Sequence, residues 1–355
     1  MRKLANILFF TIITVLIVNH INFVSATEDT KNDLGKSIDE LKKVLEHEPS
    51  NVDVHYYLGL AYYDNGMVSE AIDELNKTLV LDQNYVNAYF NLGTIYTSQG
   101  DIDSAIEIFK KLLQADATNA SAEYNLGFLY NEKGLVDDAI AAYKKAIQIK
   151  PDYHQSLNNL GIIYFKKGLL DNAVAIYTKA IEVNADYAEA YYNLGAVYLE
   201  QDQLDNAISQ LEKSTSLAPD FAGAYYNLGI AYRKKGMPDE AISALNRALE
   251  INPEDLKSLN ILAITLHEKG KFEDAIFEYE KIAAITPKDA NVRYNLGVAY
   301  YKAGMRKEAI SELQKALKLA PDHTKAHYNL GVIYMKKNKL SKSIEEFKKT
   351  LKIEP

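Results

Sequence analysis

The sequence contains no cysteine. Disulfide bonds, catalytic thiols and metal sites built from thiolates are therefore excluded. The same absence excludes a lipid-modified amino-terminal cysteine, and with it a bacterial lipoprotein. No stretch rich in glycine, serine or proline interrupts the chain, so the sequence predicts one continuous array without flexible linkers.

Glycine and proline are scarce, but nearly all of them follow one 34-residue period. Fifteen of the 17 glycines fall in two positions of this period, and seven of the 8 prolines fall in a third. The first glycine position follows a leucine, in Leu58-Gly59, Leu92-Gly93, Leu126-Gly127, Leu160-Gly161, Leu194-Gly195, Leu228-Gly229, Leu296-Gly297 and Leu330-Gly331. The second comes seven residues later, at Gly66, Gly100, Gly134, Gly168, Gly236, Gly270 and Gly304. A fixed period of this length indicates a stack of similar supersecondary units.

The period from Val86 to Asn119 shows what each unit is. Two apolar stripes with helical spacing predict two helices, the first through Tyr89, Leu92, Ile95 and Tyr96 and the second through Ile102, Ala105, Ile106, Phe109, Leu112 and Leu113. Between them lies Gly100, where a left-handed residue ends a helix at little cost. Gly93 and Ala105 are small, so we expect the two helices to cross there with close backbones. Such a hairpin cannot bury its own apolar face and needs neighbours on both sides.

The pattern of Leu-Gly, tyrosine, alanine and proline resembles the tetratricopeptide repeat family. The tyrosine recurs at Tyr62, Tyr96, Tyr130, Tyr164, Tyr198, Tyr232, Tyr300 and Tyr334, and the alanine at Ala71, Ala105, Ala139, Ala173, Ala207, Ala241, Ala275 and Ala309. The resemblance implies an all-α, right-handed α-solenoid of tandem helix-turn-helix repeats. It covers residues 52–355 as nine repeats, which start at 52, 86, 120, 154, 188, 222, 256, 290 and 324. Residues 27–51 precede them and contain a truncated half-repeat.

The last repeat carries polar residues on its second helix. Ser343 and Thr350 stand where other repeats mostly have alanine, and three lysines lie nearby. This composition predicts a polar cap for the array.

The amino terminus differs in kind from the repeats. Arg2 and Lys3 precede an apolar run from Leu4 to Val18, and Ala26 ends a small-residue cleavage motif. These features predict a secretory signal peptide, residues 1–26. The alternative is an uncleaved anchor, although a membrane span needs about 20 mostly apolar residues. In either case we expect the repeats to be exported. A cleaved chain would be periplasmic or secreted. An uncleaved chain would be anchored by one amino-terminal transmembrane helix, its only contact with the membrane, with the repeats outside the cytoplasm. Cleavage would change the net charge of the chain from −8 to −10. This negative charge disfavours nucleic acid as a partner.

The residues do not form a recognisable catalytic or metal-binding set. Among seven histidines, only His323 and His327 have the spacing of two ligands on one helix face, and no third ligand accompanies them. The glycines occupy separate positions and form no phosphate-binding loop. The sequence therefore predicts no enzyme activity, no metal and no cofactor.

The resemblance implies a concave groove lined by the first helix of each repeat. One position there forms an asparagine ladder: Asn91, Asn125, Asn159, Asn193, Asn227, Asn295 and Asn329. The preceding position forms an aromatic series: Tyr56, Phe90, Tyr124, Tyr192, Tyr226, Tyr294 and Tyr328. The ladder resembles that in the superhelical repeat region of O-linked N-acetylglucosamine transferase, whose catalytic domain has no counterpart in this sequence. A carboxamide both donates and accepts hydrogen bonds, so it can hold an extended peptide backbone. The alternative is that the asparagines serve the packing of the helices.

These patterns predict an exported scaffold or adaptor that binds peptide segments or partner proteins in its concave groove. The alternative function is a substrate-docking subunit for a separately encoded glycosyltransferase or envelope-assembly machine. The sequence leaves the ligand and the oligomeric state open.

Overall fold

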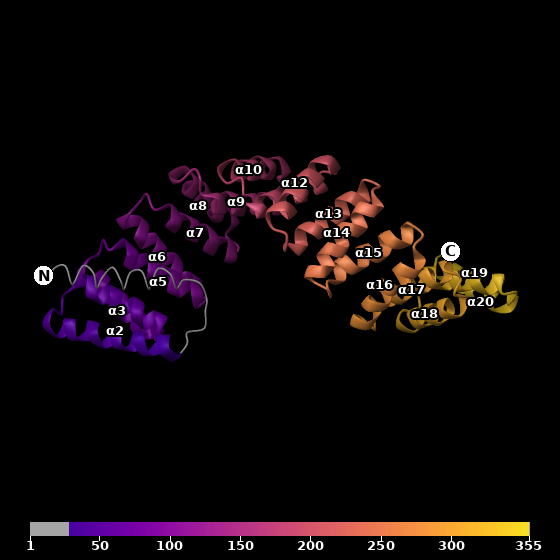
Figure 1. The fold of residues 1–355 in the computed structure, drawn as a ribbon, viewed down its shortest axis with the longest axis horizontal. Helices are drawn as coiled ribbons and strands as arrows, with labels where there is room; N and C mark the ends of the chain where they lie inside the picture. Colours follow the sequence, from indigo (N-terminus) through magenta and orange to yellow (C-terminus); the bar gives the residue numbers. More distant parts are fainter. Residues whose placement is uncertain (1–27, 355) are drawn as a thin grey trace. The chain divides into compact units, whose positions relative to one another are not determined.

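The computed structural model describes the backbone of residues 28–354 and the side chains of residues 37–354. The predicted signal peptide or anchor, residues 1–26, lies outside the described residues. The described part consists of helices joined by short turns and contains no strand (Figure 1). Its helices include none that is long and apolar enough to cross a membrane. The chain divides into two compact units between Pro151 and Asp152.

Each unit is a row of helical hairpins. The first contains α2 (Glu28–His47), α3 (Val52–Asp64), α4 (Val68–Leu81), α5 (Val86–Ser98), α6 (Ile102–Ala115), α7 (Ala120–Glu132) and α8 (Val136–Ile149). The second contains α9 (His154–Lys166), α10 (Leu170–Val183), α11 (Ala188–Glu200), α12 (Leu204–Leu217), α13 (Ala222–Lys234), α14 (Pro238–Ile251), α15 (Leu256–Glu268), α16 (Phe272–Ile285), α17 (Ala290–Lys302), α18 (Arg306–Leu319), α19 (Thr324–Lys336) and α20 (Leu340–Ile353).

Odd-numbered helices are the first helices of the hairpins and even-numbered helices are the second. Within each unit, a second helix packs against both its own first helix and the first helix of the following repeat. The predicted all-α solenoid of tandem helical hairpins is thus confirmed.

Left-handed residues separate the two helices of each hairpin. Gly100, for example, has φ +74° and no atom close to the place of a Cβ, so conformation alone selects glycine there. Asp202 and Asn338 occupy the same turn in the two repeats without this glycine, both with φ 57°. Aspartate and asparagine tolerate this conformation better than other side chains do.

The glycine of each Leu-Gly pair makes room for a large side chain of the second helix. A Cβ on Gly93 would lie 2.8 Å from the ring of Phe109, and one on Gly195 would lie 2.7 Å from Cγ of Leu211. The backbone of the second helix is also close, since the Ala207 carbonyl oxygen would lie 3.3 Å from the Gly195 Cβ. The expected close backbones are therefore present, but the nearest neighbour is a side chain that fills the crossing.

The predicted polar cap on the last described helix is wrong. Ser343 of α20 is buried and donates a hydrogen bond of 2.8 Å to the Gly331 carbonyl oxygen, so it faces its own first helix. The outer face of α20 instead exposes Leu340, Ile344 and Leu351. The same face of earlier repeats packs on a neighbouring hairpin, which explains its apolar composition.

One buried hydroxyl offers a stability test. The Ser156 hydroxyl is fully buried and has no hydrogen-bond partner among the described residues, while alanine fills this position at Ala122 and Ala190. Because an unsatisfied buried polar group is costly, Ser156→Ala should raise the free energy of unfolding by about 1 kcal/mol in urea titrations. Ser258 is the control, since its hydroxyl donates to Asp255 over 2.6 Å and Ser258→Ala should be destabilising. A loss of stability in both variants would contradict the interpretation of Ser156.

Candidate functional site

The asparagine ladder lies on the first helices and is half-buried throughout. All seven asparagines are partly exposed, whereas the leucine that follows each of them is buried; Leu92 and Leu194, for example, are 0% and 3% exposed. The aromatic series is more varied, from Tyr56 at 9% exposed to Tyr328 at 54% exposed. A side chain that served the core alone would be excluded from solvent like the neighbouring leucines.

Ladder amides reach back to the preceding repeat. The Nδ2 of Asn91 donates to the Tyr56 hydroxyl over 2.9 Å, and the Nδ2 of Asn329 donates to the Tyr294 hydroxyl over 3.2 Å. Asn193 makes the same connection to Oδ1 of Asn158, at 2.8 Å, because Asn158 stands where most repeats have an aromatic residue. At these three junctions the ladder and the aromatic series form one hydrogen-bonded surface.

The amide hydrogens of the ladder are also used within the helix. Nδ2 of Asn91 donates a second bond of 3.0 Å to the Asn87 carbonyl oxygen, and Nδ2 of Asn125 donates one of 2.8 Å to the Ser121 carbonyl oxygen. With both of its hydrogens engaged, Asn91 offers its Oδ1 acceptor to a ligand. Burial raises the pKa of Tyr56, and the hydrogen bond from Asn91 offsets part of this rise.

The aromatic series also contacts the turn before the next first helix. The ring centroids of Tyr192 and Phe221 are 4.7 Å apart, and those of Tyr56 and Tyr85 are 4.9 Å apart. These turn residues were not predicted as part of the surface. Their recurrence as Tyr85, Tyr153, Tyr187 and Phe221, one residue before a first helix, is the signal that could have revealed them.

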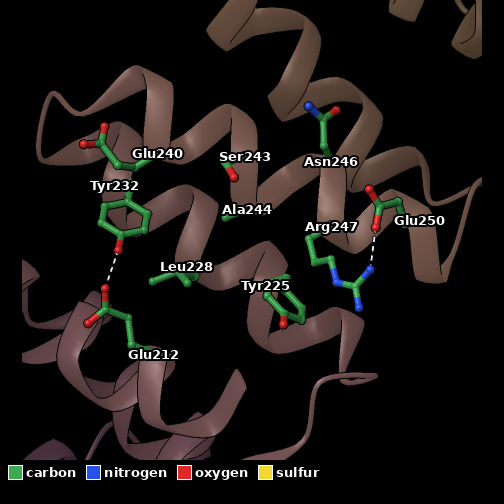
Figure 2. Close-up of a pocket in the computed structure, with 10 residues that line it drawn as sticks. All are labelled: Glu212, Tyr225, Leu228, Tyr232, Glu240, Ser243, Ala244, Asn246, Arg247 and Glu250. Atoms are coloured by element: carbon green, nitrogen blue, oxygen red, sulfur yellow. Dashed lines mark hydrogen bonds and ion pairs between the residues drawn. The ribbon is translucent and has the colours of Figure 1, made fainter. Parts of the chain in front are cut away.

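A second surface, formed chiefly by second helices, contains a cleft in each unit. In the second unit a cleft of about 600 Å³ lies between α12 and α14, with α13 beneath it (Figure 2). It is lined by Glu212, Tyr225, Leu228, Tyr232, Glu240, Ser243, Ala244, Asn246, Arg247 and Glu250. In the first unit a cleft of about 370 Å³ occupies the equivalent place between α6 and α8. The prediction from the sequence covered only the first-helix face and missed these clefts.

Two polar contacts organise the larger cleft. The Tyr232 hydroxyl donates to Glu212 over 2.5 Å at one end, and Arg247 pairs with Glu250 over 2.5 Å at the other (Figure 2). Burial and the hydrogen bond to the Glu212 carboxylate raise the pKa of Tyr232 to about 12. The tyrosine is therefore neutral near pH 7, and its hydroxyl donates to the carboxylate.

Comparison with models of known families shows which family the repeats belong to. Residues 153–354 match the family model of the cilia and flagella-associated protein 70 C-terminal domain. Residues 30–66, 61–96, 93–134 and 129–168 match the model of the tetratricopeptide repeat. The chain belongs to the tetratricopeptide repeat family. No curated protein matches it significantly.

Several solved tetratricopeptide repeat structures are similar to parts of the chain. The crystal structure of YrrB, described as a TPR protein with an unusual peptide-binding site, is 29% identical, covers 52% of this chain and 95% of its own, and has a TM-score of 0.49. A crystal structure of MamA is 36% identical over 47% of this chain and 97% of its own, with a TM-score of 0.43. PilF of Pseudomonas aeruginosa is 20% identical over 58% and 94%, with a TM-score of 0.50, a likeness in fold.

The two closely spaced histidines of the last tetratricopeptide repeat have separate structural partners. His323 accepts a hydrogen bond of 3.2 Å from the Ala326 amide and caps α19. His327 contacts a Glu346 oxygen over 2.5 Å through Nδ1 and the Pro321 carbonyl oxygen over 2.9 Å through Nε2. The described residues contain no group of three or more side chains suited to hold a metal. The tetratricopeptide repeat fold is generally non-catalytic.

Proposed function

We propose that the chain is an exported scaffold or adaptor whose first-helix face binds peptide segments or partner proteins. The observation that carries this proposal is the partial exposure of all seven ladder asparagines on a face that also presents the aromatic series. Amides supply hydrogen bonds to a peptide backbone, and aromatic rings supply apolar contact area at low cost in conformational entropy. Function then consists of holding partners together.

The hydrogen bonds between repeats support this role because they fix the binding groups before a ligand arrives. The amides of Asn91, Asn193 and Asn329 are each held by a residue of the preceding repeat. Ordering these side chains on binding therefore costs little entropy, and preorganisation of this kind strengthens binding. A neutral amide ladder would recognise backbone geometry rather than a charged side chain.

Two ladder residues provide the test of this face. Asn227 makes no hydrogen bond within the described residues, whereas Asn193 supports the buried Asn158. Replacing both with alanine removes up to two ligand bonds worth about 0.5–1.5 kcal/mol each, which weakens binding by about fivefold to more than a hundredfold. Affinity capture from envelope extract identifies a partner peptide, and calorimetry with that peptide measures the loss.

The single variants separate binding from packing. Asn227→Ala should weaken binding of the partner peptide while leaving the melting temperature of the protein unchanged. Asn193→Ala should also lower the melting temperature, because Asn158 loses its partner. If the double variant melts much lower and binds the peptide as tightly as the parent, the ladder is structural and the proposed face is wrong.

Export is part of the proposal and has its own test. The basic start, short apolar run and Ala26 motif support cleavage after residue 26. Intact-mass measurement of the protein recovered from its native host should give a chain that begins at Thr27. A species that begins at Met1 and stays with the membrane fraction would instead support the anchor, and a full-length species in the cytosol would contradict export.

A further inference from the structure

The repeat tyrosine near the end of each first helix is covered by a lysine in several repeats. Lys42 lies 5.5 Å from the ring centroid of Tyr62, and Lys110 lies 5.8 Å from that of Tyr130. Both lysines come from the preceding second helix, 20 residues before the tyrosine. In the last repeat, Lys342 lies 5.7 Å from the ring centroid of Tyr334 and comes from 8 residues after it. The protein thus shows that an ammonium group fits over this tyrosine from either side.

Two repeats have glutamates where these lysines would be. Around Tyr232, the residues 20 before and 8 after are Glu212 and Glu240. Around Tyr300, two repeats further on, they are Glu280 and Glu308. In both cases the tyrosine hydroxyl donates a hydrogen bond to the preceding glutamate. No lysine or arginine among the described residues covers either ring.

The Tyr232 cleft has more acidic than basic side chains in its lining. Arg247 is the one basic residue of its lining and is engaged by Glu250 at the far end (Figure 2). Glu240 is exposed and makes no hydrogen bond or ion pair with any described residue, and the same holds for Glu308 near Tyr300. An ammonium group over either ring would meet a π face and two carboxylates, all of which favour a cation.

We propose that the Tyr232 cleft, and the equivalent place at Tyr300, bind lysine side chains of a basic segment of a partner protein. Each ammonium group occupies the position that Lys110 takes over Tyr130, with the glutamates on either side as its counter-charges. The two places occupy the same position in repeats that are two apart within the second unit, so one segment with spaced lysines can engage both. This surface involves the second helices and does not depend on the asparagine ladder.

The experiment uses the full chain and an acetyl-tetralysine-amide peptide. The peptide should shift the ring signals of Tyr232 and Tyr300 in spectra of isotope-labelled tyrosine, assigned with Tyr232→Phe and Tyr300→Phe variants. The double variant Glu240→Gln, Glu308→Gln should bind the peptide about fivefold to tenfold more weakly, since each site loses a counter-charge. The control is Glu254→Gln, Glu273→Gln, which removes the same charge from exposed positions elsewhere in the unit and should change binding less than twofold.

A third variant places a lysine of the protein itself over each tyrosine ring. Glu212→Lys, Glu280→Lys recreates the arrangement of Lys110 over Tyr130, so it should abolish the ring shifts while the fold, checked by circular dichroism, is retained. The proposal is wrong if the two glutamine double variants lose affinity equally, because the peptide then responds only to net negative charge. It is also wrong if a peptide with acetylated lysines binds as well, or if the two ring signals do not move.

Discussion

Replacing Phe109 with alanine should lower the free energy of unfolding by about 3–5 kcal/mol, the usual cost of removing a large buried aromatic side chain. Phe109 is 0% exposed and fills the crossing of α5 and α6 against Gly93. The glycine opposite has no side chain that could close the space. Urea unfolding followed by circular dichroism measures the change.

Phe109→Leu is the matched variant. Leucine fills the same position at Leu75 in the first unit and Leu211 in the second, each 0% exposed and packed against the glycine of its own repeat. The leucine variant should therefore recover most of the stability lost in the alanine variant. If the two variants are equally destabilised, the aromatic ring makes a contact beyond filling the crossing, and volume alone does not explain the packing at Gly93.

Gly195→Leu should be destabilising by about 1–3 kcal/mol, because the new side chain overpacks a filled crossing. Even a Cβ would lie 2.7 Å from Cγ of Leu211 and 3.3 Å from the Ala207 carbonyl oxygen. Each repeat contacts only its neighbours, so the damage should stay local. Hydrogen exchange should speed up mainly between about Asp152 and Pro253, with the later repeats protected.

The same substitution in a Leu211→Ala background is the control. Alanine at 211 leaves room for a leucine at 195, so the double variant should be more stable than the sum of the two single changes predicts. Uniform loss of protection along the whole second unit would show that it unfolds as one block, contrary to the expectation of local damage.

The fold could be predicted from the sequence because the repeat period and the backbone conformations of single residues are local properties. Gly100 adopts the positive φ that the sequence predicts for the residue ending its helix. The filling of the Gly93 crossing by Phe109 could not be predicted in the same way. It depends on how two helices cross and which rotamer the ring adopts. Helical periodicity specifies neither.

Less of the candidate site than of the fold could be predicted from the sequence. The spacing alone put the asparagines and aromatic residues on the first helices, but it could not show that Asn91 bonds to Tyr56, 35 residues earlier. The cleft at Tyr232 was missed for a related reason. Its walls come from helices of two successive repeats, and the position of Glu212 relative to Tyr232 becomes meaningful only when those repeats are stacked.

The bonds from ladder asparagines to the preceding repeat set a minimum size for any transplant of this surface. Asn193 belongs to one repeat, while its partner Asn158 belongs to the one before. If the repeat of Asn193 were grafted alone into another scaffold, its amide would lack the Asn158 oxygen that orients it. The smallest portable module is a consecutive pair, and a library of chimeras should be cut between pairs rather than between individual hairpins.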